Sequence, residues 1–384
     1  MTDDVRPFVP ARLLSQYVPG DFFLATEQRT ILGSGAAQTF TDVDAVRLSE
    51  RVSAVLAESA TPFAVGALPF DTTGKPGHVV VPESLHIAGP AHPEAAALST
   101  ADIPAPIGVV PVPDPGKHAD AVAHAVTALE QRRMRKVVLA RALDLEFAED
   151  VAAQAILHNL LRENPHGYTF AAALPGGRTL MGASPELLLS RRGDRVVSHP
   201  HAGSAPRSAD PVRDKENGRA LEASRKDQAE HAVLIEALVE TLRPFCRKLD
   251  VPAGPSLVCT PAVWHLRTTV TGELIDRDVT ALRLAAALHP TPAICGSPTG
   301  TARELVGELE PFDRGYYAGT VGWVDAAGDG EWVVSIRCAE VAEQAMRLYA
   351  GGGIMPASDP WSEVAETTAK FRTLLGAMGL ELED

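Results

Sequence analysis

The amino-acid sequence predicts an α+β fold. Strand-like runs follow one another in pairs joined by short turns, and they do not alternate one by one with helices as in a doubly wound parallel sheet. The run of three glycines at 351–353 is not a G-x-G-x-x-G sequence leading into a long helix, which disfavours a dinucleotide-binding fold. A length of 384 residues allows one large domain or two ordinary ones.

The N-terminal hundred residues carry short apolar runs, such as FAVGALPF at 63–70, that are broken by glycine and proline. This pattern predicts strands and turns. The stretch at 101–116 is rich in proline and is either a linker or an extended crossing segment. We place a boundary there, between residues 1–105 and residues 106–384.

Apolar periodicity and turn residues predict the elements beyond this boundary. Helices are expected at 119–133, 150–163, 212–242, 278–288, 302–309 and 361–378, with Pro244 ending or kinking the longest of them. Strands are expected at 136–147, 168–174, 179–182, 187–190, 195–198, 317–325, 331–338 and 346–350, with a hairpin turn at 192–194.

The overall charge limits the classes of ligand. Acidic residues outnumber basic ones by 49 to 35, which gives a net charge of -14 and a pI near 5.3. This balance opposes sequence-independent binding to nucleic acid, which needs a basic surface. It does not oppose an anionic small molecule, because a few local cations and backbone N–H groups can outweigh the overall field.

Cysteine usage and the N-terminus indicate the compartment. The four cysteines are widely spaced without a C-x-x-C pair, so reduced, mostly buried thiols are a better interpretation than zinc ligands or disulfides. The N-terminus is acidic and lacks an apolar segment, and no run of about 18 apolar residues occurs. We expect a cytoplasmic monomer that binds neither nucleic acid nor membranes.

Glu230 is the first candidate for a functional site. It lies in RKDQAEHAVLIEALVETL, where Leu234 and Leu238 follow at four-residue steps and share its helix face. Such a carboxylate either reaches water at the helix end or is paired with a cation in a polar site.

The last helix offers two further carboxylates. Glu363, Glu366 and Lys370 lie three and four residues apart, which places them on one helix face. They form either a solvated Glu–Lys pair or, with a carboxylate from a second helix, a site for Mg²⁺. The glycines at 351–353 form either a tight turn or a backbone cradle for an anion.

Four other polar residues stand in apolar or turn sequences. Lys136 begins a strand and Arg337 lies within one, so each is either an edge residue or faces a polar cavity. His265 is either a satisfied buried histidine or a catalytic group, and Glu186 is either a turn residue or an acid.

These same stretches resemble the chorismate-utilising enzymes, the family of anthranilate, aminodeoxychorismate, isochorismate and salicylate synthases. The resemblance spans roughly residues 136 to 380, and the N-terminal hundred residues carry little of it. It rests on ordered blocks: KVVLAR, GASPELLL, HAGSAPR, KDQAEH, WHL, HPTPAICG, ELEPFDRGYYAGTVGW, GEWVVSIRCAE, AGGGI and a final ETxxK. It implies one large chorismate-binding domain in which two facing β-sheets are wrapped by helices.

The resemblance also implies the roles of individual residues. Glu230 and Glu366 should hold Mg²⁺, with Glu363 beside them, and the metal should bind the ring carboxylate of chorismate. The remaining substrate-binding positions are Gly203, Ser204, His265, Ala293, Tyr317, Arg337, Gly351, Gly353 and Lys370. Lys136 should deprotonate a water that attacks C2, and Glu186 should protonate the departing 4-hydroxyl.

Fewer positions indicate the branch of the family. Ala202 stands where aminodeoxychorismate synthases carry a lysine nucleophile, and 203–205 departs from the G-T-R-x-R-G run of anthranilate synthases. The blocks GSAPR and GEWVVSIRCA look most like isochorismate synthases of the siderophore, 2,3-dihydroxybenzoate-forming type. Ala293 agrees with that branch, whereas Tyr317 resembles salicylate synthases, so salicylate synthase is the alternative, followed by a non-catalytic chorismate-binding relative.

Overall fold

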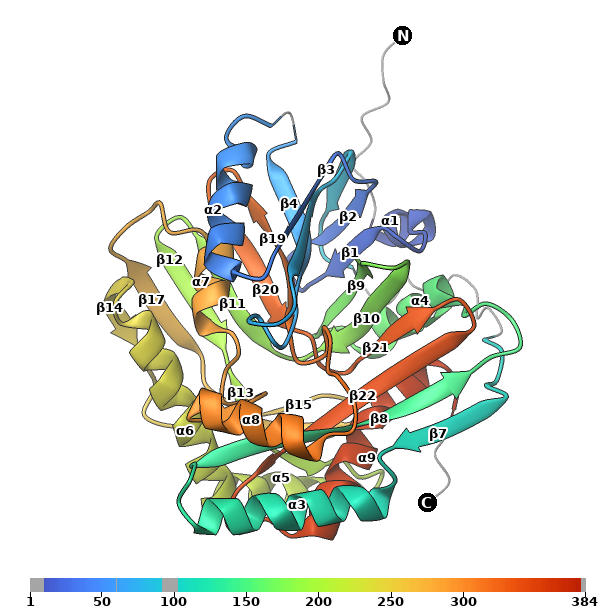
Figure 1. Cartoon of the computed structure of the whole chain (residues 1–384), viewed down its shortest axis with the longest axis vertical. Helices are drawn as coiled ribbons and strands as arrows, with labels where there is room; N and C mark the ends of the chain where they lie inside the picture. Colours follow the sequence, from blue (N-terminus) through green and yellow to red (C-terminus); the bar gives the residue numbers. More distant parts are fainter. Residues whose placement is uncertain (1–9, 60, 92–102, 381–384) are drawn as a thin grey trace.

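The computed structural model describes residues 10–59, 61–91 and 103–380. In this part of the chain the strands form two large antiparallel sheets and one small sheet (Figure 1). In sheet order, the first sheet contains β18 (Gly296–Ser297), β8 (Lys136–Glu146), β22 (Ala345–Ile354), β21 (Cys338–Ala342), β10 (Arg178–Ser184), β9 (Tyr168–Leu174), β1 (Phe22–Ala25), β2 (Thr30–Ser34) and β6 (Ser84–Ala88), and β7 (Gly108–Val112) also pairs with β8.

The second sheet has a different set of strands from both halves of the chain. In order, they are β14 (Cys246–Asp250), β17 (Val270–Leu274), β12 (Arg195–His199), β11 (Leu187–Arg192), β20 (Gly330–Val334), β19 (Thr320–Asp325), β4 (Phe63–Leu68), β5 (Gly77–Val81) and β3 (Gln38–Asp42). The small sheet contains β13 (His201–Pro206), β16 (Val263–Arg267) and β15 (Ser256–Cys259).

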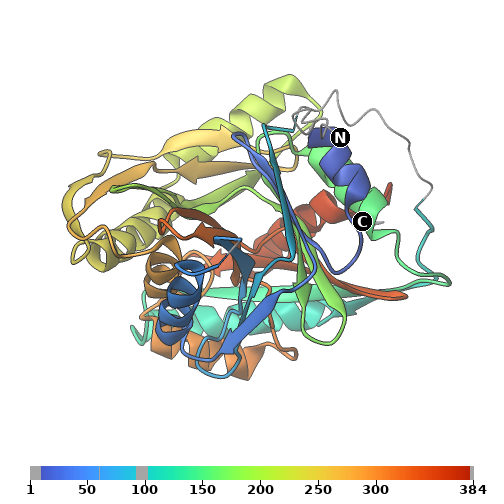
Figure 2. The same cartoon turned by 90° about the horizontal axis from the view of Figure 1, so that it is seen from above.

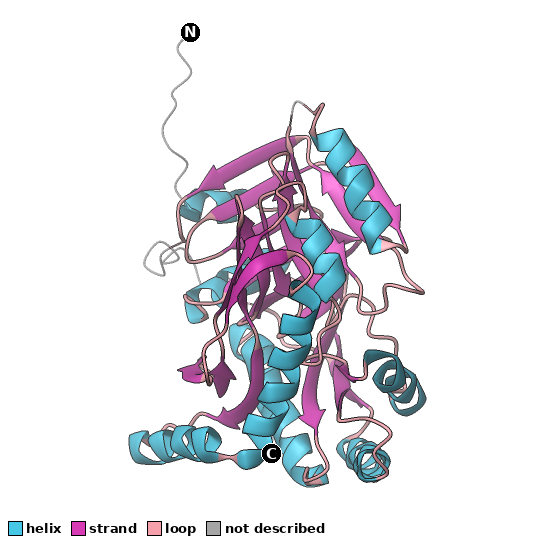
Figure 3. Cartoon of the chain, turned by 90° about the vertical axis from the view of Figure 1, so that its left-hand side faces the viewer, coloured by secondary structure: helices cyan, strands magenta, loops and turns pink. Residues whose placement is uncertain are grey.

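Helices lie on the outside of these strands (Figure 3). They are α1 (Pro10–Gln16), α2 (Ala45–Leu56), α3 (Pro115–Glu130), α4 (Ala153–Glu163), α5 (Pro211–Ala223), α6 (Arg225–Leu242), α7 (Ala281–Leu288), α8 (Thr299–Leu309) and α9 (Pro360–Ala377). Within the described ranges, no helix is long and apolar enough to cross a membrane.

Strands from the N-terminal part complete both large sheets. β1 pairs with β9 in the first sheet, and β4 pairs with β19 in the second. Seen from above, the blue N-terminal strands lie beside strands from the middle of the chain (Figure 2). The two halves of the sequence therefore build one α+β unit, and the expected fold class is confirmed.

Two apolar clusters hold the layers together. One lies between the large sheets and joins side chains such as Phe170 of the first sheet to Trp323 and Val333 of the second. The other lies on the opposite face of the first sheet, where Leu157 of α4 and Phe371 of α9 cover it. Burial of this apolar surface is the main force that holds the sheets face to face under their helices.

The chain passes between the two large sheets several times, and two of these crossings lie next to each other. It leaves β10 and enters β11 through Pro185 and Glu186, and it returns from β20 to β21 through 335–337. The two crossings run side by side, since Val334 N donates to the Glu186 carbonyl (3.1 Å) and Ala183 N donates to the Arg337 carbonyl (3.1 Å).

Three expectations about local structure were wrong. The strand expected at 331–338 is two strands in different sheets, because apolar residues continue through the crossing and mask it. The helix expected at 212–242 is α5 followed by α6, because the Ser224 side chain accepts from Asp227 N and caps a new helix. The glycines at 351–353 do not follow a strand but lie within β22, paired with β8.

Part of the proline-rich stretch belongs to the first sheet. Residues 108–112 of this stretch form β7 and pair with Ala142–Glu146 of β8, so they do not act as a linker. Strands or turns expected at 1–9, 60 and 92–102 lie outside the described residues.

Candidate active site

A cavity lies where the two crossings approach β8, β22 and α9. Its wall contains Glu186 and Arg337 from the crossings, and Tyr317 from the segment before β19. Arg337 and the neighbouring Ala318 have φ values of 52° and 54°, in the left-handed region that side-chain-bearing residues seldom adopt. Such strain at a cavity wall is a typical feature of functional sites.

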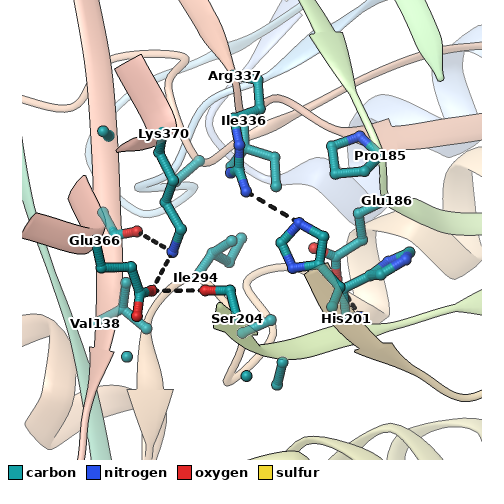
Figure 4. A pocket seen from close by; sticks show the side chains of 18 of the residues that line it. Val138, Pro185, Glu186, His201, Ser204, Ile294, Ile336, Arg337, Glu366 and Lys370 are labelled. Carbon is teal, nitrogen blue, oxygen red and sulfur yellow. Dashed lines mark hydrogen bonds and ion pairs between the residues drawn. The ribbon is translucent and has the colours of Figure 1, made fainter. Parts of the chain in front are cut away.

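Glu186 is a buried carboxyl group in this cavity (Figure 4). Burial raises its pKa to about 7, although the backbone N–H of His201 and the cations Lys136, Arg337 and Lys370 oppose this shift. A large fraction of Glu186 is therefore protonated near neutral pH, so it can donate a proton at a pH where an exposed glutamate cannot.

Lys136 is fully buried at the first residue of β8. Its Nζ lies 2.8 Å from Oε1 of Glu230, but the angles of this ion pair fall outside those of a hydrogen bond, so the ammonium is not satisfied. A Cβ atom at Gly353 would lie 2.1 Å from Glu230 Oε1 and 2.9 Å from Lys136 Cε. Glycine is required at position 353 because the Lys136–Glu230 pair occupies the space of a side chain.

Arg337 and His265 meet on another side of the cavity. Nη2 of Arg337 lies 3.3 Å from Nε2 of His265, and both side chains are buried. Burial, followed by the charge of Arg337, holds the pKa of His265 well below its usual value. The imidazole is therefore neutral and can accept the Arg337 hydrogen bond, while the rest of the guanidinium remains available to an anion.

Two stacked tyrosines line the cavity between β22 and the segment before β19. The rings of Tyr317 and Tyr349 lie 4.7 Å apart at an angle of 5°. A Cβ atom at Gly351 would lie 2.7 Å from the Tyr317 hydroxyl, so that hydroxyl occupies the space beside the bare backbone of β22. Burial raises the pKa of Tyr317, which keeps the phenol protonated as a hydrogen-bond donor.

Glu366 stands on α9 beside the same strand. Its Oε1 accepts hydrogen bonds from Ser204 Oγ (2.8 Å) and Lys370 Nζ (2.5 Å), and Lys370 also donates to the Gly351 carbonyl (2.8 Å; Figure 4). Burial alone would raise the pKa of Glu366, but the Lys370 charge and these hydrogen bonds hold it below its usual value. Glu366 is therefore an anion inside the cavity wall.

Glu363 lies one helical turn earlier on α9. Its Oε1 accepts from Lys226 Nζ (2.7 Å) and Ser358 Oγ (2.7 Å), whereas its buried Oε2 has no hydrogen-bond partner. Burial, followed by the nearby Glu366 carboxylate, raises the pKa of Glu363. An unpaired carboxylate oxygen at a buried site is costly unless a cation or a donor joins it.

The carboxylates suit a metal that the protein and a ligand bind jointly. In the described part of the chain, no three His, Cys, Asp or Glu side chains converge closely enough to hold an ion alone. Mg²⁺ does not need such a cage, because it uses one or two carboxylates and completes its shell with water and substrate oxygens. Oε2 of Glu363 and Oε1 of Glu366 both lie near the bare backbone at Gly352, which leaves room for that arrangement.

The structure brings the predicted site residues together. The cavity wall contains all of them except Lys136 and Glu363. Lys136 lies behind the wall and forms an ion pair with Glu230, which is part of the wall. Glu363 lies next to Glu366, which is also part of the wall. The other wall residues that the sequence patterns did not indicate are Val138, Pro185, His201, Ile294, Ala318, Ile336, Tyr349 and Ala350. Lys226 was also missed, although its position four residues before Glu230 on α6 was a visible signal.

Comparison with known proteins gives consistent results. The family model described as "Chorismate binding enzyme" matches residues 97–379. The chain is 46% identical over 389 residues to isochorismate synthase DhbC of Bacillus subtilis, covering 96% of each chain. It is 38% identical over 376 residues to the vibriobactin-specific isochorismate synthase of Vibrio cholerae, covering 96% of this chain and 94% of that protein.

A solved structure shows the same fold throughout. The crystal structure of DhbC from Bacillus anthracis superposes with a TM-score of 0.92 at 43% identity, over 97% of this chain and 100% of that one. The family model covers most of the chain, and the relatives and the solved structure cover almost all of it. The chain belongs to the chorismate-binding enzyme family.

Proposed function

We propose that this protein is an Mg²⁺-dependent isochorismate synthase, which adds a hydroxyl at C2 of chorismate and removes the hydroxyl at C4. The observation that carries this proposal is Glu186, a buried acid with a pKa of about 7 in a cavity that also holds the cations Arg337 and Lys370. Chorismate is a dicarboxylate whose 4-hydroxyl must leave with a proton. The cavity supplies both the cations for the carboxylates and the acid for the hydroxyl.

The proposed reaction needs one base and one acid. Lys136 takes a proton from water, whose oxygen forms a bond to C2 of the ring. The ring double bonds shift, the bond between C4 and its oxygen breaks, and Glu186 gives its proton to the departing hydroxyl. One water is added and one is lost, so the reaction is an isomerisation and needs no oxidant or reductant.

Glu230 and Glu366 would hold the metal, with Glu363 beside them, and bound Mg²⁺ would neutralise the ring carboxylate of the substrate. Arg337 and the backbone at Gly351 would hold the enolpyruvyl carboxylate. The orphaned oxygen of Glu363 and the bare backbone of the 351–353 glycines support this assignment.

The remaining substrate contacts are proposals from the same cavity. Tyr317 would donate to the enolpyruvyl group, His265 and Lys370 would lie against carboxylate oxygens, and Gly203, Ser204, Ala293 and Gly353 would shape the wall. All of these residues line the cavity, which supports their assignment as substrate contacts.

We assign catalysis to residues 106–384 and a sheet-building role to residues 1–105. Every residue of the cavity wall falls between Val138 and Lys370, which supports this division. The relatives are isochorismate synthases, and one of them is specific for vibriobactin synthesis. We therefore place the product in the supply of 2,3-dihydroxybenzoate for siderophores.

The test is turnover of chorismate by the purified full chain, with one arm containing Mg²⁺ and one arm containing a chelator. We expect chorismate to be consumed only in the first arm. Binding of chorismate without turnover in both arms would instead identify a non-catalytic member of the family.

A further inference from the structure

Close behind the cavity lies a buried ion pair that the mechanism does not use. Glu310 follows α8 and Arg314 lies four residues later, and both side chains are only 3% exposed. Nη2 of Arg314 lies 2.5 Å from Oε1 of Glu310, and Nε lies 2.8 Å from Oε2. Neither residue belongs to the cavity wall.

The pair completes one edge of β8. On that edge β18 pairs with β8 at Lys136 and Val137, and β7 pairs with it from Ala142 onward, which leaves a gap between them. Within the gap, the Val138 carbonyl accepts from Arg314 Nη2 (2.7 Å) and Ala140 N donates to Glu310 Oε1 (2.7 Å). The side chains of Arg314 and Glu310 thus satisfy backbone groups of β8 that a neighbouring strand would otherwise satisfy.

Arg314 also reaches two other parts of the cavity wall. Its Nη1 donates to the Ile294 carbonyl (2.7 Å), and its guanidinium lies 5.9 Å from the centre of the Tyr317 ring. The Tyr317 N–H in turn donates to the Arg314 carbonyl (2.8 Å). One guanidinium is therefore fixed to the segments that carry Val138, Ile294 and Tyr317, all of which line the cavity.

We propose that Glu310 and Arg314 are positioning residues that set the shape of the cavity wall formed by Val138, Ala293, Ile294 and Tyr317. This inference rests on the proposed function, because chorismate is the ligand whose fit the wall determines. The planar guanidinium directs several donors at fixed angles, whereas a lysine ammonium is a point charge that cannot reach the same separated acceptors.

The chain offers a matched control for loss of a buried arginine. Arg191 of β11 is 2% exposed, donates to the carbonyls of Ala327 (2.7 Å) and Arg277 (2.5 Å), and pairs with Asp329. It has the same kinds of partner as Arg314, but none of these partners of Arg191 lines the cavity. Arg191→Lys and Arg314→Lys should therefore lower stability by similar mechanisms.

The experiment compares these two variants in the full chain. Thermal unfolding measures stability. Calorimetry with a chelator, where no turnover is expected, measures the Kd of chorismate, and steady-state assays with Mg²⁺ separate KM from kcat. We expect both variants to lower Tm, but only Arg314→Lys to raise KM and Kd, by about tenfold or more, because small displacements of a binding wall are costly. If Arg314→Lys lowers Tm with unchanged KM and Kd, or if Arg191→Lys raises them equally, the proposal is wrong.

Glu310→Gln is the second variant, in case Arg314→Lys does not fold. It retains an oxygen for Ala140 N and removes only the charge that fixes Arg314. A raised Kd supports the proposal and an unchanged Kd overturns it. The proposed function fails separately, if the wild-type chain itself neither binds nor converts chorismate.

Discussion

Nζ of Lys136 lies 2.8 Å from Oε1 of Glu230, so the proposed base neutralises a proposed metal ligand that lines the cavity. Lys370 and Glu366 form a second such pair, and Lys226 and Glu363 a third. The carboxylates are therefore held in place by lysines. Binding of a divalent cation has to compete with, or join, these ion pairs.

This arrangement predicts the effect of removing one carboxylate charge. Glu230→Gln and Glu366→Gln should each weaken Mg²⁺ binding by at least about tenfold and lower turnover at low Mg²⁺, because divalent cations depend on carboxylate charge. Titration calorimetry with Mg²⁺ gives the affinity, and circular dichroism confirms the fold. Glu236→Gln on the same helix is the control, since this exposed residue pairs with Arg135 away from the cavity. Wild-type affinity in the Glu230 or Glu366 variant would exclude that residue as a ligand.

The acid and the base should affect rate more than binding. Lys136→Ala and Glu186→Gln should lower kcat by about 10² to 10⁴, the usual range for general acid–base groups, and keep a Kd for chorismate near that of the wild type. Single-turnover kinetics and calorimetry measure the two quantities. Unchanged kcat with weakened binding would show that the residue only positions the substrate.

Glu186 also predicts a pH dependence of stability. Its folded pKa of about 7 exceeds the ordinary value of 4.5, so the unfolded chain releases the proton first as pH rises. The wild type should therefore lose about 3 kcal/mol of stability between about pH 4.5 and pH 7, relative to Glu186→Gln, because the variant cannot titrate.

Urea unfolding of both proteins at pH 5 and pH 8, in the presence of a chelator, measures this difference. The free energy of unfolding of the variant, relative to that of the wild type, should be higher at pH 8 than at pH 5. A stability difference that is equal at both pH values would mean that Glu186 has no raised pKa in the fold.

Position 293 predicts the balance between isochorismate and salicylate. Ala293 lines the cavity and lacks the hydroxyl that salicylate synthases tend to carry there. Ala293→Thr should raise the share of salicylate and pyruvate, because its hydroxyl can help hold isochorismate for elimination. Ala293→Val is the control, since valine has the same shape without the hydroxyl. Equal product ratios in both variants would assign any change to bulk and not to hydrogen bonding.

The sequence indicated which residues lie together at the cavity better than it indicated their backbone. Glu230, Glu363, Glu366 and Lys370 could be singled out because helical spacing places charges on one face, and the family blocks implied the roles proposed for them. The crossing at Arg337 could not be found, because a chain that leaves one sheet for another keeps an apolar pattern on both sides.

Contacts between segments that are distant in the sequence could not be predicted either. Arg314 and Glu310 are four residues apart and predict an ordinary helical or surface pair. Their actual partners, Val138, Ala140 and Ile294, are 20 residues or more away from the residue that each contacts, and only the fold brings them near. Gly353 is likewise required because Lys136 and Glu230 fill the space beside it. These two residues are far from Gly353 in the sequence, so no local pattern could predict this contact.

The central claim is that chorismate is isomerised and released without further elimination. The most direct measurement is chromatography of the wild-type reaction with chorismate and Mg²⁺, without ammonia, run near neutral pH and stopped early. The predicted result is isochorismate with little salicylate or pyruvate. Salicylate and pyruvate appearing early, in amounts comparable to isochorismate, would contradict the account and identify a salicylate synthase.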